Sequence, residues 1–197
     1  EWIQLFNGED LNHWVVKIKG YSLNVNVHNT FRVENGMLKI SYDEYQNFDA
    51  SYGHIFYNKP FSNYKLRLQY RFIGTQVNGG ESWAEKNSGV MVHSQSPESM
   101  KINQDFPVSI EVQLLGGLHQ NEKRPTANLC TPGTYIIMNG ILVTTHCIES
   151  SSKTYYGDEW INLEVLVIRD SIIIHKINGK EVISYSKPQI GGEYNTL

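Results

Sequence analysis

The stretch INLEVLVIRDSIIIHKINGKEVIS, residues 161–184, decides the fold class. Its first part carries apolar side chains at alternate positions, namely Ile161, Leu163, Val165 and Val167. Its last part places Asn178-Gly179 between two apolar runs. An Asn-Gly pair in this setting is typical of a type I′ hairpin turn, because both residues accept positive φ. The stretch therefore predicts consecutive antiparallel strands.

The same signals recur along the chain. Asn35-Gly36 and Asn139-Gly140 also separate apolar runs, and residues 64–72 and 108–114 alternate between apolar and polar side chains. No long stretch keeps the 3.6-residue apolar period of a helix. We therefore predict a single all-β domain over residues 1–197, an antiparallel sandwich or barrel.

Charge and motifs exclude several protein classes. The chain has 197 residues, 17 basic and 20 acidic, and a formal net charge of −3, which argues against a nucleic-acid partner. No apolar run reaches the length of a membrane span. The motifs GxxxxGK[ST], GxGxxG, HExxH and GxSxG are absent. Histidines with metal-ligand spacing are absent as well, so we expect no cofactor and no metal.

Three long connections, roughly residues 73–88, 94–107 and 115–134, separate the expected strands. Loops of this length in a compact β domain are more often functional than idle. We therefore treat them as candidate substrate loops.

The two cysteines, Cys130 and Cys147, lie on either side of Asn139-Gly140. Paired positions in that hairpin sum to 279, and the cysteines sum to 277, so we expect them to be close enough for a disulfide bond. Two buried free thiols are the alternative. A disulfide would favour a periplasmic or secreted protein, and we expect that a signal peptide has been removed before Glu1.

Several segments resemble one family. Leu5-Phe6-Asn7-Gly8, Asp10-Leu11 and Trp14 are similar to the LFNGxDLxxW opening of the DUF1080 family, also called the 3-keto-disaccharide hydrolase domain. Asn87-Ser88-Gly89-Val90 and the strand around Glu111 and Gln113 resemble two further family segments, and Trp160 and the Asn178-Gly179 hairpin complete the match.

This resemblance implies a concanavalin A-like jelly-roll sandwich of two antiparallel sheets. It implies a glycoside hydrolase with a carbohydrate substrate, secreted or periplasmic, and for some members a sugar first oxidised at carbon 3.

Strand alternation nominates the site residues. Glu111 and Gln113 share the polar face of their strand, because side chains two apart point the same way. Glu111 is the candidate catalytic acid or base, or else a solvated or ion-paired carboxylate. Gln113 is a candidate substrate donor, or a surface polar group.

Other residues could join this groove if their strands share its sheet. His93 is a second catalytic candidate or a structural histidine, and Arg67 and Arg71 are substrate-binding candidates or a solvated face. Trp83 could stack on a sugar or only pack, and Asn87 could bind substrate or cap its strand. His175, in an Ile-rich strand, is expected to be a packed histidine.

One departure bears on mechanism. Concanavalin-like retaining glucanases carry an ExDxE strand, whereas this strand has Glu111, Gln113 and Leu115 on one face. It therefore lacks the second carboxylate of a retaining mechanism, unless Glu81 or Glu85 supplies it from a loop. A 3-keto sugar needs only one base, because its ketone acidifies the neighbouring C–H. We predict elimination followed by hydration. A non-catalytic carbohydrate-binding module or lectin-like domain is the alternative, and a structural interaction domain is a weaker third.

Overall fold

The structure is a computed structural model that describes residues 1–197. Contacts divide the chain into two compact units, which are described separately. The first comprises residues 1–60, 77–80 and 96–106, and the second comprises residues 61–76, 81–95 and 107–197. The single domain expected for residues 1–197 stays a prediction. No helix is long and apolar enough to cross a membrane.

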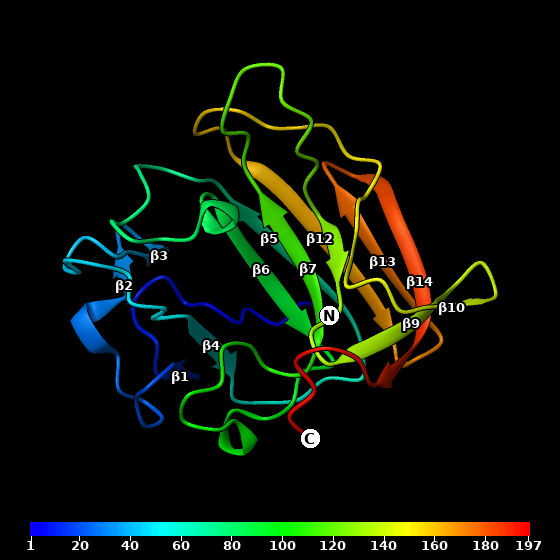
Figure 1. The fold of residues 1–197 in the computed structure, drawn as a ribbon, viewed down its shortest axis with the longest axis horizontal. Coiled ribbons are helices and arrows are strands. Elements are labelled where there is room, and N and C mark those ends of the chain that lie inside the picture. Colours follow the sequence, from blue (N-terminus) through cyan, green and yellow to red (C-terminus); the bar gives the residue numbers. More distant parts are fainter. The chain divides into compact units, whose positions relative to one another are not determined.

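The second unit is built from two antiparallel sheets. The six-stranded sheet has, in spatial order, β10 (Ile141–Val143), β9 (Thr134–Met138), β14 (Lys180–Ile190), β13 (Ile172–Ile177), β12 (Ile161–Ile168) and β5 (Asn63–Tyr70). The four-stranded sheet has β11 (Cys147–Ile148), β8 (Asn128–Cys130), β7 (Ile110–Leu115) and β6 (Asn87–Val92), and the short 3-10 helix η2 (Ser82–Ala84) precedes β6. Figure 1 shows β6 and β7 lying over β5 and β12. The predicted all-β sandwich of antiparallel sheets is confirmed.

The apolar faces of the two sheets form one core. Val112 and Leu129 come from the four-stranded sheet, and Leu163, Val165 and Ile173 come from the six-stranded sheet; all are almost fully buried. Burial of an aliphatic side chain of this size stabilises the fold by about 1.5–3 kcal/mol. Because β7 buries Val112, it turns the side chains before and after that residue to the opposite face.

His175 is the polar exception in this core. Its ring is completely buried, its Nδ1 lies 2.9 Å from the carbonyl oxygen of Ala127, and its Nε2 lies 2.7 Å from the Tyr185 hydroxyl. Burial lowers the pKa of His175 to about 4. A neutral ring donates from Nδ1 to the carbonyl and accepts the hydroxyl proton at Nε2. The expected packed histidine is confirmed.

All three Asn-Gly pairs form the predicted two-residue turns. Both members of each pair have positive φ, for example 48° at Asn178 and 81° at Gly179. The pairs join β2 to β3, β9 to β10 and β13 to β14. Local turn chemistry is thus sufficient to set these hairpins.

The first unit is smaller and less regular. Strand β1 (Trp14–Ile18) pairs with β4 (Gly53–Tyr57), and β2 (Phe31–Glu34) pairs with β3 (Met37–Ile40). The 3-10 helices η1 (Val27–Asn29) and η3 (Pro97–Ser99) lie between strands. Val16, Ile18 and Phe31 form its core.

Parts of two expected substrate loops belong to this first unit. The buried Lys17 ammonium donates to the carbonyl oxygens of Ile18 (3.1 Å) and Ile102 (3.0 Å), and Lys19 pairs with Asp105 at 2.6 Å. His54 Nε2 lies 2.8 Å from the Asp105 carbonyl. These contacts anchor residues 96–106 structurally. The third expected loop, residues 115–134, contains β8, a strand too short for alternation to reveal.

Candidate functional site

One row of side chains crosses the outer face of the four-stranded sheet. Met91 of β6 lies opposite Glu111 of β7, Glu111 lies opposite Cys130 of β8, and Cys130 lies opposite Cys147 of β11. Directly opposed residues of an antiparallel pair point to the same face. The Glu111 side chain therefore stands between a thioether on one side and the cysteine pair on the other.

The two cysteines form a disulfide bond with an S–S distance of 2.03 Å. They are direct partners in β8 and β11, whereas Asn139-Gly140 joins β9 and β10 of the other sheet. The expected proximity is therefore reached by a different pairing: the chain changes sheet at residues 131–133, which shifts the register from a sum of 279 to 277.

The carboxyl group of Glu111 leans diagonally over Gly89. A Cβ atom built at Gly89 would lie 2.4 Å from Glu111 Oε1, 2.8 Å from its Cγ and 3.0 Å from its Cδ. Gly89 is exposed, and Glu111 is half-buried. The carboxyl group thus occupies space that any other residue at position 89 would fill, and this edge of the face is open to solvent.

Burial raises the pKa of Glu111 to about 7. A carboxyl group without an ion partner in a poorly hydrated position disfavours its charged form. Near neutral pH, Glu111 can therefore both accept and return a proton, which suits a general acid or base.

Gln113 lies one row along the same face. Its Oε1 accepts a hydrogen bond from Asn128 Nδ2 at 3.2 Å, and Asn128 Nδ2 also donates to the Pro125 carbonyl at 3.0 Å. The backbone N–H of Ser150 donates to Asn128 Oδ1 at 2.9 Å. Because this buried asparagine is fixed, it holds the Gln113 side chain toward β8 through the Oε1 atom.

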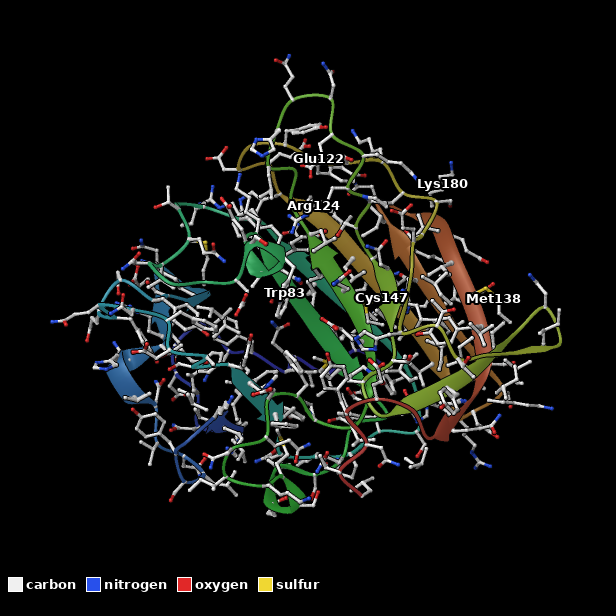
Figure 2. The ribbon with its side chains drawn as sticks, viewed as in Figure 1. Trp83, Glu122, Arg124, Met138, Cys147 and Lys180 are labelled. Atoms are coloured by element: carbon white, nitrogen blue, oxygen red, sulfur yellow. A yellow bond between two sulfur atoms is a disulfide. The ribbon has the colours of Figure 1, made fainter.

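The loop before β6 closes one end of this face. Asn87 Nδ2 donates to the Trp83 carbonyl at 3.0 Å, and the Arg124 guanidinium donates to the carbonyl oxygens of Glu85 at 2.7 Å and Trp83 at 3.3 Å. Figure 2 labels Trp83, in the loop before β6, and Arg124, in the connection between β7 and β8. Arg124 also donates to the Gly116 carbonyl. Asn87 and Arg124 therefore hold the loop, while the Trp83 side chain is half exposed.

A family model for the 3-keto-alpha-glucoside-1,2-lyase-like domain matches residues 1–196. The chain belongs to this family. A search of curated proteins found no match to it.

The segments that carry the resemblance to the lyase-like family have distinct roles here. The opening segment forms a turn that the Asn7 side chain stabilises. Asn7 Oδ1 accepts hydrogen bonds from the backbone N–H groups of Glu9 (2.9 Å) and Asp10 (3.0 Å). The segments containing Gly89 and Glu111 are β6 and β7, which are direct neighbours. The family pattern thus combines a structural turn with the face that carries Glu111.

His93 does not project beside Glu111, so the expectation from alternation is wrong. Its φ of 50° ends the regular strand after Val92, and its Nε2 lies 3.0 Å from the Arg169 carbonyl, in the turn that follows β12. A residue in the left-handed region breaks the period of two on which the expectation rested.

Arg67 and Arg71 also lie apart from Glu111. The strand that carries Arg67 pairs with β12, so it belongs to the six-stranded sheet and not to the sheet of β7. Arg67 Nε donates to Glu164 at 2.7 Å, and the Arg71 guanidinium stacks over the Trp160 ring at 4.7 Å. The condition for one shared groove, that the strands belong to one sheet, is therefore not met by the strand that carries Arg67. A role of Arg67 and Arg71 in substrate binding stays a prediction.

Alternation places Gly89 and Met91 on this face, but it did not reveal how closely Glu111 approaches Gly89, or the contact of Asn128 with Gln113. A glycine inside a strand often marks a close approach of another group, and that signal was present at Gly89. The partnership of Asn128 with Gln113 was not detectable, because it depends on the pairing of β7 with the very short β8.

Proposed function

We propose that the protein cleaves glycosides that carry a ketone at carbon 3, by elimination across carbons 1 and 2, with Glu111 as the base. One observation carries the proposal: a lone, half-buried carboxyl group with a pKa of about 7 stands on the outer face of β7, beside the exposed Gly89. Membership of the lyase-like family supports the same chemistry.

The reaction needs a single base. The Glu111 carboxylate removes the proton from carbon 2, and the C–H electron pair forms an enolate that the carbon 3 ketone stabilises. The enolate collapses, a double bond forms between carbons 1 and 2, and the C1–O bond breaks. The departing oxygen takes a proton from water, and Glu111 releases the proton that it accepted, which restores the carboxylate. Addition of water, with H to carbon 2 and OH to carbon 1, completes a net hydrolysis.

Gln113 supplies a donor for this chemistry. Its Oε1 is bound to Asn128, so its Nε2 group can donate to the enolate oxygen or to a sugar hydroxyl. A donor directed at an oxygen that gains negative charge stabilises the transition state. The half-exposed Trp83 side chain is proposed to stack on the sugar.

The strand itself argues against a retaining mechanism with two carboxylates. That mechanism needs carboxyl groups about 5–5.5 Å apart. The positions that follow Glu111 on its face are Gln113 and Leu115, and neither is acidic.

Turnover assays test the proposal. A 3-keto-glucoside should be cleaved and the unoxidised glucoside should not, and the rate of cleavage should rise with pH through about 7 as Glu111 ionises. Glu111→Gln should lower kcat about 10²–10⁴-fold, the usual contribution of a general base. Glu164→Gln is the matched control, because that carboxylate pairs with Arg67 on the six-stranded sheet. Equal activity of the Glu111→Gln and control variants would refute the assignment of the base.

A carbohydrate-binding module is the competing function, favoured by the missing second carboxylate. Such a module would bind glycans equally well with Glu111→Gln and would turn over no substrate. We also propose a periplasmic or secreted location, which the disulfide bond supports.

A further inference from the structure

Residues of the two neighbouring strands limit the space available to Glu111. Met91 stands directly opposite it on β6, and Cys130, joined to Cys147, stands opposite it on β8. Along its own strand, Gln113 is drawn toward Asn128. The carboxyl group takes the diagonal across β6, over Gly89, and diagonal neighbours in a sheet are within reach of a long side chain.

Gly89 matters at this position because it has no side chain, and not because its backbone conformation is unusual. Its φ is not in the left-handed region, so an alanine could adopt the same conformation. The three atoms nearest to a Cβ at position 89 all belong to Glu111. Substitution at this position therefore acts first on the Glu111 carboxyl group.

We propose that Gly89 is a positioning residue, whose missing side chain provides the seat in which the Glu111 carboxyl group lies. The catalytic consequence rests on the proposed function, but the placement of the carboxyl group does not. A methyl group at position 89 would overlap this seat and force the carboxyl group outward into water. There its charged form is better solvated, and the carboxyl group loses the property that suits it to proton transfer.

The test compares Gly89→Ala with the wild type by NMR titration of the Glu111 carboxyl carbon, which is assigned by its absence in Glu111→Gln. We expect the pKa of Glu111 to fall by at least one unit in Gly89→Ala. The low-pH limb of the kcat profile should move down by the same amount, and kcat should fall more than tenfold at neutral pH with little change in KM. An unchanged pKa in folded Gly89→Ala would overturn the proposal.

A second comparison keeps the proposal falsifiable if Gly89→Ala folds poorly. In the Glu111→Ala background the overlapping atoms are absent, so Gly89→Ala should be tolerated, and the double variant should match the urea midpoint of Glu111→Ala. A double variant as unstable as Gly89→Ala alone would show that the methyl group clashes elsewhere, which contradicts the proposal. The NMR titration and the urea comparison need no substrate. A protein that turns over no 3-keto-glucoside would therefore refute the proposed function, and these two measurements would still decide whether Gly89 positions the carboxyl group.

Discussion

At the scale of single residues, burial shifts the pKa values of two groups in opposite directions. Glu111 has its pKa raised to about 7, and His175 has its pKa lowered to about 4, both chiefly by burial. In each position the neutral form of the group is favoured, because burial penalises charge. The fold therefore holds the Glu111 carboxyl group at a cost in stability at neutral pH.

Glu111→Gln should stabilise the protein in proportion to that cost. The folded state holds the Glu111 proton more tightly than the unfolded state, so the native protein loses stability as pH rises from about 4.5 to 7. Glutamine has no such penalty. We expect the variant to gain about 2–3 kcal/mol in unfolding free energy at pH 8 and almost nothing at pH 4, measured by urea denaturation. An equal effect at both pH values would contradict the raised pKa.

For His175 we expect the opposite dependence of the unfolding free energy on pH. The unfolded state binds the imidazole proton more readily, so the contribution of His175 is complete above about pH 6.5 and is lost as pH falls toward 4. Comparing wild type with His175→Gln should show a difference in unfolding free energy that shrinks by about 3 kcal/mol over this interval. A pH-independent difference would show that the histidine carries no titration penalty. Between pH 4.5 and 6.5 the effects of His175 and Glu111 on the unfolding free energy change with pH in opposite directions. Each effect is therefore measured by comparing the wild type with the variant that lacks that group.

At the scale of secondary-structure elements, local patterns predicted the hairpins and the strand faces, because turn chemistry and alternation act over a few residues. Alternation failed at His93, where one left-handed residue ends β6. It could not assign β5 to a sheet, because the pairing of β5 with β12 joins residues about 100 positions apart. It also missed β8 and β11, which are too short to show a period.

The Asn-Gly turns allow a matched comparison at this scale. Asn178 and Asn139 have similar φ values, 48° and 52°. Asn178 Oδ1 also accepts from the Asn162 backbone N–H at 3.0 Å, and its Nδ2 donates to the Tyr155 hydroxyl at 3.1 Å. We expect Asn178→Ala to cost about 1–2 kcal/mol more than Asn139→Ala in thermal or urea unfolding, because it alone loses these bonds. Equal costs would show that only backbone strain matters.

At the scale of the whole molecule, the Cys130–Cys147 bond stabilises the folded chain, and such bonds persist in oxidising compartments. It closes a loop with a sequence separation of 17, for which chain-entropy estimates give about 3 kcal/mol. Protein isolated without reductant should add no alkyl label after denaturation, and reduced protein should add two, as measured by intact mass. Two labelled thiols in the unreduced protein would remove both the bond and the proposed secreted or periplasmic location.

The central claim is that Glu111 removes the proton from carbon 2 of a 3-keto sugar. Its most direct test is the kinetic isotope effect on kcat/KM for a 3-keto-glucoside deuterated at carbon 2, measured under conditions in which the substrate alone does not exchange its label. We expect a primary isotope effect in the wild type, together with a solvent-derived hydrogen at carbon 2 of the product. Cleavage without an isotope effect, with the deuterium fully retained at carbon 2, would contradict the elimination and the role assigned to Glu111.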